Sequence, residues 1–276
     1  MTRTDRKLMK KTASVLLFAL SITGFVRADD TGDLGELALR RVAYEVDGVK
    51  MESTIVWDRE NGDDRPGILM VPNWMGPSRA SLEKAMRIAG DDYVVMMVDL
   101  YGVDVRPENQ EEASQAAGVL RGDRAMMRER MAKAEEVLLE QVGVPLEDGD
   151  LAAIGFCFGG GAVLEYARTG ADLDAVVSFH GDLLSPTLAE DSRDIRASVL
   201  VLHGAADPFV PQSDVSEWVA VMLDTKVDWQ LVQFSNTVHS FTDPTASMAG
   251  KAEYNALSSE RAFAYMDELF EEKFGD

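Results

Sequence analysis

The heptapeptide GFCFGGG, residues 155–161, constrains the fold of this chain more than any other segment. It follows an apolar run that predicts a buried strand, 150–156, and leads into a segment that predicts a helix, 160–168. Its glycines surround one cysteine at a sharp strand-to-helix turn, where larger neighbouring side chains would collide with the backbone. The pattern favours an α/β unit in which the helix packs closely on a sheet.

Strand and helix patterns alternate through most of the chain. Residues 42–58 alternate apolar and polar side chains around Asp47-Gly48, which predicts an antiparallel hairpin. Later strands are predicted at 67–74, 93–102, 150–156, 174–181, 198–207 and 227–235, and helices at 78–90, 124–140, 160–168, 212–223 and 252–274. The polar segment 106–115 predicts a loop. We therefore expect a mainly parallel central sheet with helices on both faces and an antiparallel hairpin at its N-terminal end.

Residues 1–28 have the order of a secretory signal peptide: a basic start, an apolar run at 13–25 and small residues around Ala28. We therefore expect export, to the periplasm or the medium, and a single mature α/β domain spanning 29–276. The apolar run is short for a membrane span, so stable membrane insertion is not expected after cleavage. An uncleaved anchor is the alternative.

The chain carries 27 Lys and Arg against 48 Asp and Glu, a formal net charge of −21. Such acidity disfavours nucleic acid and anionic membranes as partners, which leaves a small molecule. The sequence has no dinucleotide-binding motif, and its three histidines lack the spacing of metal ligands, so neither a cofactor nor a metal is predicted. The sequence does not indicate an oligomeric state.

Cys157 is the only cysteine, so it cannot form a disulfide within the chain. It is either a reactive thiol, half of an intermolecular bridge, or an inert buried side chain. Its setting favours the first reading: it occupies the centre of a G-x-nucleophile-x-G turn, directly before a helix whose N-terminus stabilises a thiolate.

A reactive thiol needs a base, and the base needs a group that orients it. His239 follows a predicted strand and lies in a loop that can reach the turn. Asp207 follows another strand, in GAADPFVP, so the chain order is nucleophile, acid, base. Asp182 is an alternative orienting acid. His203 lies within a strand and is interpreted as a structural polar group.

Three motifs together, GFCFGG, HGAADPFVP and VHSFTDP, resemble the dienelactone hydrolase family of α/β hydrolases. The shorter segments VDLYG and VPNWMG add weaker matches, and the resemblance covers roughly residues 40–275. It implies an α/β-hydrolase fold and a triad of Cys157, His239 and Asp207. It also implies an oxyanion hole formed by the backbone N–H groups of Phe158 and Trp74. The implied reaction is hydrolysis of a carboxylic ester, lactone or thioester through an acyl-thiol intermediate.

Two positions depart from that family. Asn73 stands where its dienelactone-cleaving members carry a glutamate, and Asp243 stands where they carry an arginine that binds a substrate carboxylate. Arg106 is a candidate for the second carboxylate-binding arginine. Because one arginine is replaced by an acid, we expect a neutral substrate rather than an anionic dienelactone.

The remaining candidates for substrate contact are Asn73, Tyr101, Arg106, His180 and Phe209, although the aromatic members could equally belong to the core. Two other functions stay open at this stage. One is a non-catalytic ligand-binding protein on the same fold, and the other is a peptidase or amidase. Residues 104–122 could form a lid over the site.

Overall fold

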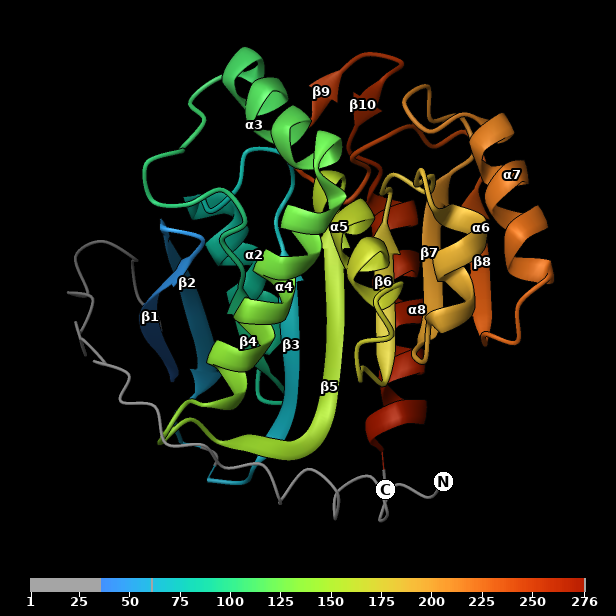
Figure 1. Ribbon diagram of the computed structural model, residues 1–276. Coiled ribbons are helices and arrows are strands. Elements are labelled where there is room, and N and C mark those ends of the chain that lie inside the picture. Colours follow the sequence, from blue (N-terminus) through green and yellow to red (C-terminus); the bar gives the residue numbers. More distant parts are fainter. Residues whose placement is uncertain (1–35, 61, 276) are drawn as a thin grey trace.

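The computed structural model describes residues 36–60 and 62–275, so the predicted signal peptide lies outside the described residues. An eight-stranded sheet with strand order β1-β2-β4-β3-β5-β6-β7-β8 runs through the molecule (Figure 1). The pairs β1–β2 and β2–β4 are antiparallel, and every pair from β4 to β8 is parallel. The expected fold class, an α/β-hydrolase fold opened by a hairpin, is confirmed.

The strands of this sheet are β1 (Leu37–Val46), β2 (Val49–Asp58), β3 (Arg65–Val71), β4 (Val94–Met97), β5 (Leu146–Phe156), β6 (Ala175–Phe179), β7 (Ser198–Gly204) and β8 (Trp229–Phe234). The helices are α2 (Arg79–Ala89), α3 (Gln110–Gly122), α4 (Arg124–Leu139), α5 (Phe158–Ala167), α6 (Leu188–Asp191), α7 (Gln212–Leu223) and α8 (Ala256–Phe274). A small hairpin joins β9 (Ser247–Met248) to β10 (Ala252–Glu253).

Two apolar layers cover the faces of the sheet. Helices α3, α4, α5 and α7 contribute to one layer, and α2 and α8 contribute to the other. Successive side chains of strand β3 point to opposite faces of the sheet: Leu69 and Val71 lie in the first layer, whereas Ile68 and Met70 lie in the second. Burial on both faces explains why the parallel strands are continuous apolar runs in the sequence.

The strands predicted at 67–74 and 93–102 end earlier, at Val71 and Met97, and two predictions about helices were wrong. Residues 110–115 are not a loop but the first part of α3, because the Asn109 side chain accepts the Glu112 N–H and begins the helix. The buried face of α3 consists mainly of alanines, so the apolar pattern is weak. The last helix begins at Ala256 rather than at 252, because Asn255 caps it and the preceding residues form β10.

No helix within residues 36–60 and 62–275 is long and apolar enough to cross a membrane.

Candidate active site

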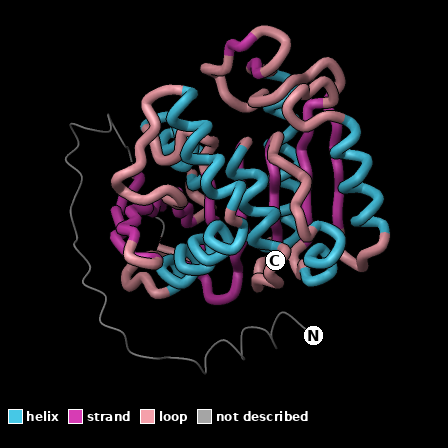
Figure 2. Tube along the Cα trace, turned by 45° about the horizontal axis from the view of Figure 1, so that its top comes forward, coloured by secondary structure: helices cyan, strands magenta, loops and turns pink. Residues whose placement is uncertain are grey.

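The candidate site lies where the parallel strands end at their carboxyl termini. Cys157 follows β5, His180 follows β6, Asp207 follows β7, and His239 lies in the loop after β8. Helix α3 and the β9–β10 hairpin stand at this end of the sheet in Figure 1, and Figure 2 turns the same end forward. Ligands of open α/β sheets bind at this edge.

Cys157 occupies a strained turn. Its backbone has φ 55° and ψ −119°, in a region that a residue with a side chain rarely adopts. A Cβ at Gly155 would overlap the Gly159 carbonyl, and a Cβ at Gly159 would overlap the carbonyls of residues 71 and 72. Glycine is therefore required on both sides of the cysteine, which lies partly exposed at the N-terminal end of α5.

Asp207 and His239 form a buried pair. Asp207 Oδ2 lies 2.7 Å from His239 Nδ1, and Oδ1 accepts the backbone N–H groups of Phe209 and Val210 at 2.8 and 3.2 Å. Because both carboxylate oxygens are engaged, the acid is fixed in orientation. Hydrogen bonds between the His239 backbone and the β9–β10 hairpin, to residues 251 and 253, hold the histidine loop in place.

His239 also interacts electrostatically with the Cys157 side chain. Because Nδ1 faces Asp207, Nε2 is the ring nitrogen left for Cys157. Burial disfavours the charged imidazole, but the electrostatic interaction with Cys157 and the hydrogen bond that His239 donates to Asp207 outweigh burial and raise the pKa of His239 to about 10. These surroundings therefore favour the charged imidazolium of His239.

The two predicted oxyanion donors lie on either side of this turn. Phe158 opens α5, where the first N–H groups have no partner within the helix. Asn73 turns the facing loop, since its side-chain oxygen accepts the Met75 N–H and its carbonyl accepts the Gly76 N–H. Within the described residues, neither the Phe158 N–H nor the Trp74 N–H has a protein acceptor.

Tyr101 supports the same loop. Its hydroxyl donates to the Trp74 carbonyl at 2.8 Å, and its ring lies 5.5 Å from that of Phe158. Burial, followed by the negative charge of Cys157, raises the pKa of Tyr101, so the hydroxyl keeps its proton. Tyr101 is 5% exposed, so its main contact is with the Trp74 loop and little of its side chain is accessible to a substrate. Phe209, by contrast, is 53% exposed and stands edge-on to His239 at 5.3 Å.

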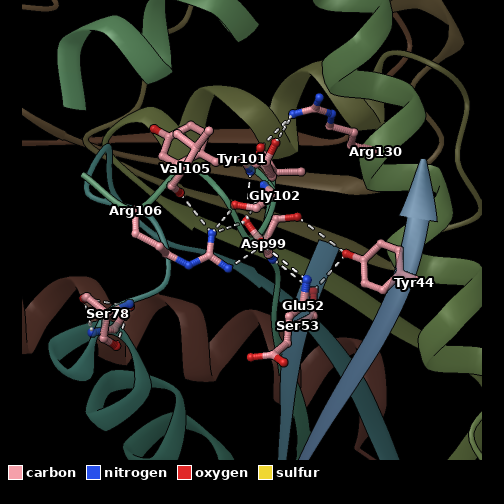
Figure 3. A network of polar contacts seen from close by, with 12 residues as sticks. Tyr44, Glu52, Ser53, Ser78, Asp99, Tyr101, Gly102, Val105, Arg106 and Arg130 are labelled. Atoms are coloured by element: carbon pink, nitrogen blue, oxygen red, sulfur yellow. Dashed lines mark hydrogen bonds and ion pairs between the residues drawn. The ribbon is translucent and has the colours of Figure 1, made fainter. Parts of the chain in front are cut away.

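Arg106 is engaged elsewhere. Figure 3 shows its guanidinium against Asp99, with an Nη2–Oδ2 distance of 2.7 Å, and it also donates to the Gly102 carbonyl. Asp99 in turn accepts the N–H groups of Tyr101 and Gly102. Within the part of the chain that the structure describes, no recorded contact joins Arg106 to Cys157 or His239. Its guanidinium supports the loop of Tyr101, and its expected role in substrate binding stays a prediction.

Arg121 is a site residue that the sequence reasoning missed. It projects from α3, pairs with Asp182 at 2.6 Å and lies 5.7 Å from the Phe158 ring, where its charge interacts with Cys157. The alternative orienting acid, Asp182, is thus engaged by Arg121, while Asp207 contacts His239. The sequence signal for α3 was Asn109, a residue type that caps helices, followed by Ala113 and Ala117 at helical spacing.

The other two histidines have different surroundings. His180 is buried and meets both the Cys157 backbone and the His239 ring. His203 is buried in β7, as expected of a structural group, and neither ring nitrogen has a hydrogen-bond partner among the described residues.

Asp243 caps its own turn by accepting the Thr245 N–H at 2.9 Å. In residues 36–60 and 62–275, no cluster of three or more His, Cys, Asp or Glu could hold a metal ion.

Comparisons with known proteins identify the family and fold of this chain. The sequence matches the dienelactone hydrolase family over residues 53–274. The solved structure of m3DLH is 36% identical, covers 87% of this chain and all of its own, and superposes with a TM-score of 0.80. P91, a dienelactone hydrolase-like promiscuous phosphotriesterase from metagenomic libraries, is 37% identical over the same share of this chain and its full own length, with a TM-score of 0.81.

An uncharacterised protein of Caenorhabditis elegans is 32% identical over 151 residues, which is 51% of this chain and 92% of that protein. The family match covers most of the chain and includes every residue of the cluster at the strand ends. The chain therefore belongs to the dienelactone hydrolase family of α/β hydrolases.

Proposed function

We propose that the protein hydrolyses a carboxylic ester, lactone or thioester, with Cys157 as nucleophile, His239 as base and acid, and Asp207 as the orienting group. One observation carries the proposal: His239 pairs at 2.7 Å with the completely buried carboxylate of Asp207 and interacts electrostatically with the Cys157 side chain. A nucleophile, a base and an orienter in mutual contact are the requirements of covalent acyl transfer.

In the proposed reaction the Cys157 sulfur attacks the substrate carbonyl carbon, whose oxygen takes up the negative charge. The Phe158 and Trp74 N–H groups stabilise that oxygen. The His239 imidazolium protonates the leaving group, and an acyl-thiol intermediate remains. His239 then takes a proton from water, whose oxygen attacks the thioester carbon. The C–S bond breaks, the carboxylic acid leaves, and the Cys157 thiolate and the His239 imidazolium are restored.

A neutral substrate suits the charges around the site. Arg121 is the arginine beside Cys157, and Asp182 already neutralises it. Asp243 adds no positive charge, and the guanidinium of Arg106 is engaged by Asp99. The exposed ring of Phe209 beside His239 offers an apolar contact for the acyl or alcohol group.

Phosphotriester hydrolysis is a second candidate, because P91, 37% identical to this chain, is described as a promiscuous phosphotriesterase. The same thiolate would attack phosphorus and expel an aryl alcohol. A neutral aryl phosphotriester therefore belongs in the substrate panel. Turnover of it that depends on Cys157 would add this activity to the first.

The test uses the chain from Asp29 with a panel of short-chain aryl esters, thioesters, lactones and anilides. Wild type is compared with Cys157→Ala, and Cys157→Ser serves as a control that keeps the site's shape. Loss of turnover in the alanine variant supports the thiol mechanism, and unchanged turnover rejects it. Faster cleavage of anilides than esters favours a peptidase or amidase. Absence of turnover together with ordinary thiol reactivity favours a ligand-binding protein.

We also propose that the protein is exported and that its signal peptide is cleaved after Ala28, on the basis of the N-terminal sequence pattern. The test is N-terminal sequencing of the protein recovered outside the cytoplasmic fraction. A start at Asp29 supports the proposal, and recovery of the intact N-terminus from the membrane fraction favours the uncleaved anchor.

A further inference from the structure

His180 is held at both ring nitrogens. It follows β6 with φ 42° and is 2% exposed, and its backbone N–H donates to the Leu202 carbonyl at 2.8 Å. Nδ1 accepts the Cys157 N–H at 3.1 Å, and Nε2 lies 2.9 Å from Thr242 Oγ1. Because a backbone N–H can only donate, the ring proton is on Nε2 and is donated to the threonine hydroxyl.

The same ring also contacts the base. The His180 and His239 rings meet edge to face, with centroids 5.1 Å apart and planes at 62°. One buried side chain therefore touches the backbone of the nucleophile and the ring that must stay aligned with its sulfur. The Cys157 N–H is shared between His180 Nδ1 and the Phe179 carbonyl, so the strained turn is anchored to the last residue of β6 and the residue that follows it.

Thr242 fixes the far side of the ring. It lies in the His239 loop, is 3% exposed, and its carbonyl accepts the Lys84 ammonium at 3.5 Å. Lys84 itself lies over the Phe156 ring, 3.9 Å from its centroid. Helix α2 and the end of β5 thus hold the threonine, and the threonine holds the imidazole.

The environment keeps His180 neutral. Burial comes first, the positive charges of His239 and Lys84 add to it, and the His203 ring contributes least, so the pKa of His180 is well below its usual value; one backbone hydrogen bond opposes this shift. These groups come from the loop after β8, from α2 and from β7. A neutral ring keeps Nδ1 free of a proton, which is what acceptance of the Cys157 N–H requires.

We propose that His180 is a positioning residue, which together with Thr242 holds the Cys157 turn and the His239 ring in the geometry for proton transfer. The inference rests on the thiol mechanism proposed above. It differs from simple packing in what it affects: the alignment of sulfur and imidazole, and hence the reactivity of the thiol in the folded protein.

The matched pair Thr242→Val and Thr242→Ser tests it in the chain from Asp29. Valine has the shape of threonine without the acceptor for His180 Nε2–H, whereas serine keeps that acceptor. A misplaced nucleophile costs up to about 10²-fold in rate, so we expect kcat for a Cys157-dependent ester to fall by roughly tenfold or more in Thr242→Val, with KM little changed. Thr242→Ser should retain most of the activity.

The second readout is the pH dependence of Cys157 alkylation by iodoacetamide, which needs no turnover. The inference predicts a shifted alkylation profile in folded Thr242→Val and a wild-type profile in Thr242→Ser. Identical profiles in both variants overturn it, as does a lowered melting temperature with alkylation and kcat unchanged. If both threonine variants fail to fold, His180→Asn replaces them: asparagine tolerates positive φ and presents an acceptor toward the Cys157 N–H. His180→Asn should then react faster at Cys157 than His180→Ala, and equal rates overturn the inference.

These assays distinguish failure of the proposed function from failure of the positioning role of His180. Ester turnover that survives Cys157→Ala rejects the proposed function. The alkylation comparison still decides whether His180 and Thr242 control the reactivity of the thiol.

Discussion

Replacing Asp207 by asparagine tests the proposed site most directly. Asp207 Oδ1 accepts two backbone N–H groups, so an asparagine must place its oxygen there and its NH₂ against His239 Nδ1. Two donors then face each other, and the ring must move its proton to Nε2, toward Cys157. A hydrogen bond to a charged group contributes about 1.5–3 kcal/mol, which corresponds to a fall in the pKa of His239 from about 10 by roughly one to two.

The expected loss in kcat is about 10²–10⁴, because the same exchange in the serine-protease triad costs about 10⁴ through the wrong tautomer. The assay is the pH profile of kcat/KM for a Cys157-dependent ester, with alkylation of Cys157 measured in parallel. Asp182→Asn is the matched comparison, since Asp182 contacts Arg121 rather than His239. A larger loss in Asp182→Asn, or an unchanged profile in Asp207→Asn that has folded normally, refutes the assignment of the orienting acid.

Four further predictions follow from the structure. The raised pKa of His239 gives a stability contribution that is complete below pH 6.5 and lost as pH rises through about 10, so the melting-temperature difference between wild type and His239→Gln should shrink over that range. Gly159→Ala should prevent folding or abolish thiol reactivity, judged by soluble yield and alkylation, because its Cβ has no space. Arg106→Ala removes the guanidinium from the buried Asp99, which keeps its backbone N–H donors, and should cost about 1.5–3 kcal/mol in denaturant unfolding while leaving the KM ratio of neutral to anionic esters unchanged. Burial lowers the pKa of Lys84 to about 8, so Lys84→Met should raise the free energy of unfolding at pH 7 by up to about 3 kcal/mol and change it little near pH 10.5, as measured by denaturant unfolding.

The sequence was sufficient for the sheet and for the cluster at its carboxyl edge, because those features depend on local signals. Each of Cys157, Asp207 and His239 follows an apolar run and lies in a short motif of its own. Parallel strands bring their ends to one edge, so residues far apart in the chain could be placed together without a structure.

The features that the sequence did not predict depend on contacts between distant segments. Arg121 lies on a helix whose buried face is mainly alanine, so the apolar periodicity was too weak to predict that helix. The partner of Arg106, Asp99, was visible within VDLYG, but only the folded chain shows the carboxylate against the guanidinium. The role inferred for His180 requires Thr242 from another loop, and no local motif joins those two residues.

The three histidines show how the surroundings, and not the residue type, set the chemistry of this site. All three are buried, which disfavours a charged imidazole. His239 becomes basic because Asp207 and Cys157 contact it, whereas His180 and His203 have lowered pKa values: burial depresses both, and the charge of His239 adds to it. Neighbouring titratable groups whose pKa values are pushed apart divide the roles between them. On this reasoning His239 transfers protons, and His180 accepts a hydrogen bond from the Cys157 backbone. A substitution that places a second charge beside His239 should disturb that hydrogen bond and, as a result, proton transfer by His239.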